Sequence, residues 1–171
     1  MNQLKNHPIM VTSRDAISGD GFLAGITLSG RALMRKEDDG KWWMYGVRPA
    51  ALAESGTTID EAFSHFHNRY LETLFDIAQE ATSFDHFRQE VENFFNEGDA
   101  NDEDERLWEE SLKAIRAGNI SPPDEFGALE KKSPETNPPQ VMIERLNEAG
   151  KRFKPSDNVR PTYSFPSAMA A

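Results

Sequence analysis

The sequence contains no cysteine, which excludes disulfide bonds and thiolate catalysis and fits a reducing compartment. It also lacks any apolar run approaching about 20 residues, the length that a membrane-spanning helix requires. Its first residues lack the apolar core of a signal peptide. Apolar residues make up only 37% of the chain, so we expect part of it to lie outside a packed core. We predict a cytoplasmic protein that does not bind membranes.

Basic residues are scarce, with 19 lysines and arginines against 29 aspartates and glutamates, and the net charge is −10. This balance argues against direct nucleic-acid binding, because phosphate neutralisation supplies most non-specific affinity. A basic partner protein suits the charge better, since long-range attraction speeds encounter. The densest acidic run, residues 97–110, holds eight carboxylates and one arginine. We interpret it either as a solvated segment or as one that attracts a basic partner.

Residues 41–78 form the most strongly patterned stretch. Trp42, Trp43 and Tyr45 are typical of a half-buried strand, and Pro49 should end that strand because it cannot donate to a sheet. The Asp-Asp-Gly sequence that ends at Gly40 predicts a hairpin before the strand. Since neighbouring strand residues point to opposite faces, one tryptophan should enter the core and the other should lie on the opposite face.

A long helix should follow this strand directly. Gly56 permits a turn, and Thr58 and Glu61 have the spacing of a capping box. Apolar side chains then recur at steps of three and four residues, which predicts an amphipathic helix of about five turns. A second helix is predicted from Ser83, with a phenylalanine-rich stripe and a stop at Gly98. The apolar residues of both helices are Ile59, Ala62, Phe63, Phe66, Tyr70, Leu71, Leu74, Ile77, Ala78, Phe84, Phe87, Val91, Phe94 and Phe95.

Together these patterns predict an α+β fold. We expect an antiparallel β-meander of about three strands, including short strands near residues 9–11, 22–28 and 31–35, with the two Phe-rich helices on one face. A third helix should carry Leu107, Trp108, Leu112 and Ile115 and end at Gly118.

The C-terminal third is expected to be extended, because eight of the ten prolines lie after residue 119. Residues 119–139 look like a linker, a short helix is predicted between Pro139 and Gly150, and residues 151–171 should order only on contact with a partner. The predicted organisation is thus an α+β domain at 1–97, an acidic segment with a helix at 98–118, and a Pro-rich linker, short helix and tail at 119–171.

The strand–turn–helix stretch resembles the N-terminal domain of HicB-type antitoxins over about residues 31–80. The resemblance rests on the hairpin at Gly40, the aromatic strand, Pro49 and the Gly-x-Thr-x-x-Glu-Ala pattern. That pattern is formed here by Gly56, Thr58, Glu61 and Ala62. The sequence departs from the family where Ala50-Ala51-Leu52-Ala53 replaces the usual turn. Residues 99–171 also show no obvious compact DNA-binding unit.

The resemblance implies a partial ribonuclease-H-like fold. It also implies a function: in that family the domain binds a small basic toxin that cleaves RNA, and covers its active site. The family usually adds a DNA-binding domain that represses its own operon. Because no such domain is recognisable in this chain, the resemblance supports toxin binding more than repression.

Catalytic chemistry has little support in the sequence, and we predict no catalytic residue, metal site or cofactor. Glu61 and His65 have a spacing that could place both on one helix face, but no second ligand pair lies nearby in the sequence. The predicted strand through Met44 and Val47 lacks the central carboxylates that a metal-dependent nuclease needs. No phosphate-binding glycine motif occurs.

Three hypotheses of function remain. The first is an antitoxin-like binding protein that neutralises a basic partner, with the acidic segment and tail adding contacts. The second is a structural or adaptor subunit that self-associates as a homo-oligomer through its sheet and tail. An enzyme is the third and least supported class. The candidate partner-binding residues are Trp42, Trp43, Tyr45, Trp108, Leu112, Phe153, Tyr163 and Phe165.

Overall fold

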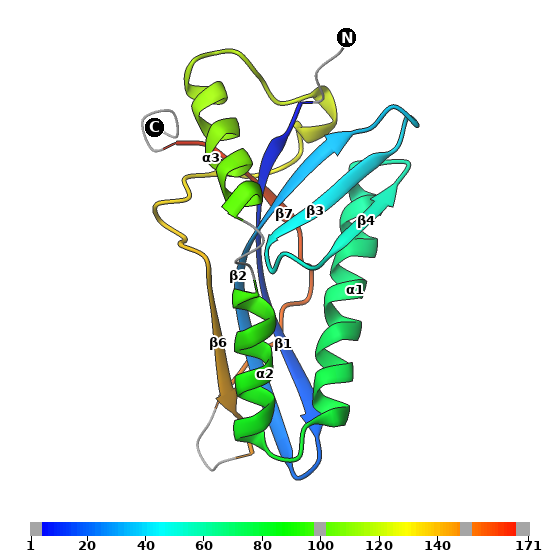
Figure 1. The fold of residues 1–171 in the computed structure, drawn as a ribbon, viewed down its shortest axis with the longest axis vertical. Helices are drawn as coiled ribbons and strands as arrows, with labels where there is room; N and C mark the ends of the chain where they lie inside the picture. The colour runs from blue at the N-terminus through cyan, green and yellow to red at the C-terminus, as the bar shows by residue number, and fades with distance from the viewer. Residues whose placement is uncertain (1–4, 98–101, 148–151, 167–171) are drawn as a thin grey trace.

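The computed structural model describes residues 5–97, 102–147 and 152–166, and it is an α+β fold as predicted. A mostly antiparallel seven-stranded sheet carries three α-helices (Figure 1). The strands are β1 (His7–Gly19), β2 (Phe22–Lys36), β3 (Trp42–Arg48), β4 (Ala53–Gly56), β5 (Lys131–Lys132), β6 (Gln140–Arg145) and β7 (Pro161–Ser164). The helices are α1 (Ile59–Glu80), α2 (Phe84–Asn96) and α3 (Asp102–Arg116), with a short 3-10 helix η2 (Asp124–Phe126).

A long hairpin of β1 and β2 forms the backbone of the sheet. The two strands pair from His7 with Met34 to Gly19 with Phe22, and Gly21 takes the positive φ of the connecting turn. Our prediction of short strands in this region was wrong, because both strands continue through polar residues. Ser29 and Gly30, where the sequence suggests a break or a bulge, lie within β2, and a register shift in the pairing with β3 falls just after them, between Arg31 and Ala32.

The strand order is β4-β3-β2-β1-β7-β5. β6 and β3 share one edge of β2, with β6 pairing along residues 24–29 and β3 along residues 31–36. The predicted hairpin before β3 is confirmed, with Gly40 at φ +80°, and β3 ends at Arg48, immediately before Pro49. The sequence did not predict β4, which pairs antiparallel with β3 where we expected a turn.

The predicted cap of α1 is confirmed. Thr58 lies just before the helix, and its hydroxyl accepts a hydrogen bond from the backbone N–H of Glu61 at 3.1 Å. The Glu61 carboxylate reaches back to Thr57 and accepts from its hydroxyl at 3.1 Å. Ser83 caps α2 in the same way, through the N–H of His86. Both helices therefore begin where side chains satisfy amide groups that the helix leaves unpaired.

Replacing Thr58 with alanine should lower the free energy of unfolding by about 1 kcal/mol, the usual contribution of an N-cap hydroxyl. Urea denaturation followed by far-UV circular dichroism would measure the change. Thr58→Ser keeps the acceptor and should remain close to wild type. Equal losses in both variants would contradict the cap's role.

Helices cover both faces of the hairpin, but at different heights. α1 and α2 lie side by side along its lower part, where α1 contacts β1 and α2 contacts β2 and β6 (Figure 1). α3 packs over the opposite face near the upper end, where the Arg31 guanidinium lies 4.1 Å from the centre of the Trp108 ring. Residues His7–Val11 of β1 are buried, because α3 contacts β1 and the rings of Trp42, Phe126 and Tyr163 pack around His7. No helix in the described ranges is long and apolar enough to span a membrane.

Three predictions for the C-terminal third were wrong. The segment after Pro139 is strand β6, not a helix. It pairs with β2, and Val141 and Ile143, two residues apart, both pack against the core. The expected linker instead buries Phe126 and Leu129 in that core. The described part of the tail, residues 152–166, includes a strand where we expected order only on partner contact: β7 pairs antiparallel with β1, from Tyr163 with Ile9 to Pro161 with Val11. Gly98, the predicted stop of α2, lies outside the described residues.

Candidate functional site

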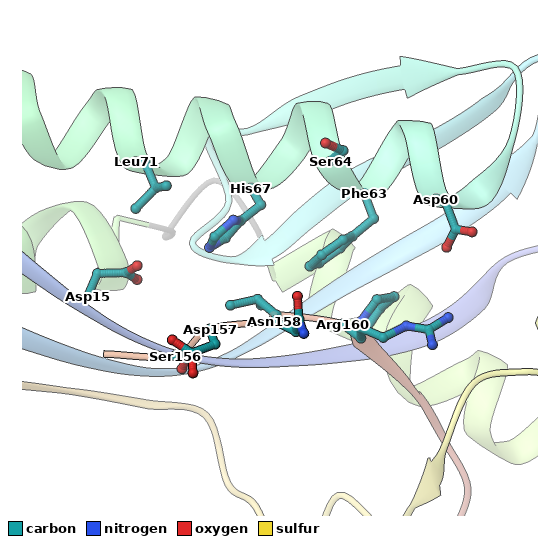
Figure 2. Close-up of a pocket in the computed structure, with 12 residues that line it drawn as sticks. Asp15, Asp60, Phe63, Ser64, His67, Leu71, Ser156, Asp157, Asn158 and Arg160 are labelled. Atoms are coloured by element: carbon teal, nitrogen blue, oxygen red, sulfur yellow. The ribbon is translucent and has the colours of Figure 1, made fainter. Parts of the chain in front are cut away.

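A polar cleft of about 430 Å³ lies between α1, β1 and the C-terminal segment that precedes β7 (Figure 2). Helix α1 forms one wall, with rings and polar groups that recur every three or four residues. Residues 156–161 form the opposite wall. The lining residues are Asp15, Asp60, Phe63, Ser64, His67, Leu71, Ser156, Asp157, Asn158, Val159, Arg160 and Pro161.

Asp15 comes from β1 and points toward α1. On that face of the strand it stands between Ser13 and Ile17, which are both buried. Its Oδ2 atom is buried and has no hydrogen-bond partner among the described residues. Burial raises the pKa of Asp15, although the nearby His67 and Ser13 side chains partly offset that rise. Asp15 is therefore a poorly solvated carboxyl group beside an open cleft.

His67 approaches the cleft from α1, with its ring toward Asp15 in Figure 2. It stacks against Phe63, with ring centres 5.9 Å apart and planes 8° apart, and against Tyr70 at 6.2 Å. Burial lowers the pKa of His67, opposed by the charge of Asp15. The imidazole is thus neutral near pH 7. Its Nε2 atom has no hydrogen-bond partner in the described part of the chain, and neither does the buried Tyr70 hydroxyl.

Ser156 holds the C-terminal wall against β1. Its backbone N–H donates to the carbonyl of Arg14 at 2.8 Å, and its hydroxyl accepts from the Arg14 N–H at 2.9 Å. These two bonds continue the β1–β7 ladder toward the cleft. They place the next residues, Asp157 and Asn158, opposite α1 with exposed polar groups.

The cleft has the character of a binding site. Within residues 5–97, 102–147 and 152–166, no group of three or more histidines, aspartates and glutamates could hold a metal ion. Ser13 is fully buried and does not line the cleft. The sequence pair Glu61 and His65 is engaged elsewhere, since His65 Nδ1 lies 2.7 Å from the Ser55 carbonyl. The cleft offers instead a desolvated carboxyl, an aromatic wall and several exposed polar groups.

In strand β3 the two adjacent tryptophans point to opposite faces of the sheet, as predicted. Trp42 is buried, while Trp43 lies half-buried on the other face and stacks on Tyr45, with ring centres 5.9 Å apart. The Arg35 guanidinium lies 4.5 Å from the centre of the Tyr45 ring, and the Tyr45 hydroxyl donates to Glu37 at 2.6 Å. Trp43 and Tyr45 therefore remain accessible, whereas Trp42 belongs to the core.

The predicted contacts on α3 are not accessible in this structure. Trp108 is 1% exposed and Leu112 is also buried, because α3 packs its apolar stripe on the sheet. Part of the acidic run has an internal role as well. The Glu105 carboxylate pairs with the Arg48 guanidinium at 2.6 Å and helps to hold α3 against β3.

The three aromatic residues of the tail pack within the chain. Tyr163 is fully buried, and Phe165 packs edge-on against it, with ring centres 4.9 Å apart. Phe153 is half-buried under the Arg14 guanidinium, at 4.8 Å. It lies over Gly25, where an added Cβ would come within 2.8 Å of the ring. None of these three rings is exposed, so the structure does not present them as free contact residues for a partner.

Asp15 and Phe75 are of functional interest but were not predicted from the sequence. Asp15 occupies a strand position that faces the helices, which the sequence shows only once the full extent of β1 is known. Phe75 on α1 is 55% exposed. A helical wheel would have found it, because it falls outside the buried stripe that includes Leu74 and Ala78.

Comparison with known proteins adds no family assignment. No family model matches this sequence, and neither a curated protein nor a solved structure shows significant similarity to it.

Proposed function

We propose that this chain is an antitoxin-like binding protein that holds a basic protein, such as a toxin ribonuclease, and covers its active surface. The observation that carries the proposal is the charge of α1 and α2. Their sequences contain eight carboxylates and two arginines, a net charge of −6. All eight carboxylate residues are exposed: Asp60, Glu61, Glu72, Asp76, Glu80, Asp85, Glu90 and Glu92.

The two arginines on these helices are already paired. Arg69 contacts Glu54 at 3.0 Å and Glu72 at 3.5 Å, and Arg88 lies 3.7 Å from Asp85. The remaining carboxylates create a surface field of one sign, which accelerates association with a basic protein and orients it. The resemblance of residues 31–80 to HicB-type antitoxins points to the same kind of partner.

Phe75 gives this acidic surface an apolar contact point. It is exposed between Glu72 and Asp76 on α1. Exposed aromatic residues within a charged surface are typical centres of binding energy, because they fill a pocket of the partner while the surrounding charges orient it. The alternative of self-association through the tail has less support, because β7 already pairs with β1.

The test uses the product of the gene adjacent to the one that encodes this chain, co-expressed with it. We expect a basic product that arrests growth alone and whose toxicity this chain relieves. Phe75→Ala should weaken binding by roughly 30-fold, as expected for a contact worth about 2 kcal/mol. Binding by the wild type should also weaken steeply as salt is raised.

Met142→Ala is the matched control, since Met142 is 53% exposed but lies on β6. It should leave binding unchanged. A neighbouring product that is neither basic nor toxic would contradict the proposed function. Equal effects of Phe75→Ala and Met142→Ala on binding would instead show that the partner does not contact α1 at Phe75.

A further inference from the structure

The burial of the Asp15 carboxyl is only partly compensated, because the nearby His67 and Ser13 offset just part of the rise in its pKa. Its Oδ2 atom has no hydrogen-bond partner in the described residues, and burial raises its pKa. A carboxylate in such surroundings gains when a cation approaches it, because the new ion pair replaces the hydration that burial removed. Asp15 lines a cleft that is open to solvent, so a ligand can enter beside it.

The charges that line the cleft are unevenly placed. Asp15 and Asp157 lie toward one end, and Asp60 and Arg160 lie toward the other (Figure 2). Three carboxylates and one arginine leave a net charge of −2 when His67 is neutral. His67 does not cancel the charge of Asp15 near pH 7, because burial lowers the pKa of its imidazole. The Asp15 end is therefore the anionic end.

The wall of the cleft suits a flat cation. Phe63 and His67, whose rings stack on each other, line the α1 side of the cleft. Guanidinium groups pack against aromatic side chains and also donate hydrogen bonds in their own plane to carboxylates. The volume of about 430 Å³ is large enough for an arginine or lysine side chain.

We propose that this cleft binds a guanidinium or primary ammonium group, which pairs with Asp15 and Asp157 and lies against the Phe63–His67 wall. The group belongs either to an arginine or lysine of the partner protein or to a free small cation. The first source rests on the proposed function, and the second does not.

Phe75 lies on α1 four residues beyond Leu71, the last α1 residue that lines the cleft. It follows Ser64 and Leu71 at near-helical spacing, so the three residues share one side of α1. A partner that contacts Phe75 with an apolar group would thus have a route by which a basic side chain could enter the cleft. This continuity favours the partner as the source of the cation.

The direct test is an NMR titration of the full chain with methylguanidinium chloride and, separately, with butylamine hydrochloride. We expect saturable shifts of amide signals in residues 60–71 and 156–160, with dissociation constants on the order of millimolar for such small ligands. Urea has a similar planar shape without the charge, and it should cause no saturable shift at the same concentrations. Equal binding of urea, or no saturable binding of either cation, would overturn the proposal.

Asp15→Asn preserves size and removes the charge, and it should weaken methylguanidinium binding at least tenfold. Asp157→Asn provides a second variant at an exposed position, where folding is not at risk, and should weaken binding several-fold. Asp38→Asn, in the exposed turn before β3, is the matched control and should bind as wild type does. Unchanged affinity in both cleft variants would refute the assigned site.

Binding of the toxic partner by Asp15→Asn separates the two sources. Loss of both methylguanidinium and partner affinity identifies the cation as a side chain of the partner. Loss of methylguanidinium affinity alone identifies it as a free small cation, and the proposed function then stands on the acidic surface and Phe75. A chain that binds methylguanidinium at Asp15 but has no basic partner would support the cleft and contradict the proposed function.

Discussion

Phe126→Ala is expected to lower the free energy of unfolding by about 3–5 kcal/mol, the range for truncating a buried phenylalanine. The Phe126 ring is fully buried in a segment with little regular structure. Its centre lies 5.1 Å from that of His7, 5.7 Å from that of Trp42 and 5.3 Å from that of Tyr163. One ring therefore joins the first, third and last strands in chain order, and alanine would leave a cavity among all three.

Guanidinium chloride denaturation, followed by tryptophan fluorescence, would measure the loss. Phe75→Ala removes the same atoms from an exposed position and should cost less than about 1 kcal/mol. Native-state hydrogen exchange should also show that β7 loses protection in Phe126→Ala. A loss below about 1 kcal/mol, or one equal to that of Phe75→Ala, would mean that the loop containing Phe126 does not stabilise the core.

Acidification should destabilise the fold through His7. This histidine is 5% exposed within the same aromatic cluster. Burial, helped by the charge of Lys5 and opposed by that of Glu125, lowers its pKa from 6.5 to about 4. The unfolded chain therefore binds a proton between pH 6.5 and 4 that the folded chain does not. The resulting stability is present above pH 6.5 and is lost as the pH falls to about 4.

The loss should amount to about 3 kcal/mol, at 1.36 kcal/mol for each unit of pKa difference. His67 contributes with the same sign, since its pKa is also lowered, whereas the raised pKa of Asp15 acts in the opposite direction. Unfolding free energies of the wild type and His7→Gln, measured at pH 7.5 and pH 4.5, would isolate the effect. At pH 7.5 the two differ only by packing.

Between pH 7.5 and pH 4.5 the wild type should therefore lose up to about 3 kcal/mol more unfolding free energy than His7→Gln does. A pH dependence that is identical in both proteins would show that His7 is not the group responsible. The comparison needs both measurements, because the substitution itself disturbs the contacts with Trp42 and Phe126.

Local signals made part of this fold predictable. The hairpin at Gly40, the end of β3 before Pro49 and the caps at Thr58 and Ser83 each depend on a few neighbouring residues. The pairings of β6 and β7 do not. Met142 pairs with Thr27, and Thr162 with Met10, across more than a hundred residues, and the prolines around them suggested an extended tail.

The candidate site was hidden for a related reason. Asp15 and His67 belong to segments that the sequence separates by the whole of β2, β3 and β4, and neither lies in a recognisable motif. The strand near residue 15 looked weak because polar residues, Ser13 and Asp15, occupy its helix-facing positions. Of these two residues Asp15 lines the cleft, so the departure from a simple apolar pattern marked the site.

The position of β7 has a consequence for biosynthesis. β1 leaves the ribosome well before β7, the strand that pairs with residues 9–11 on its outer edge and ends at Ser164. Until that residue emerges, a nascent chain must carry β1 with an open edge, which could pair with another polypeptide. Protection of this edge would then depend on a chaperone or on the early arrival of a binding partner during translation.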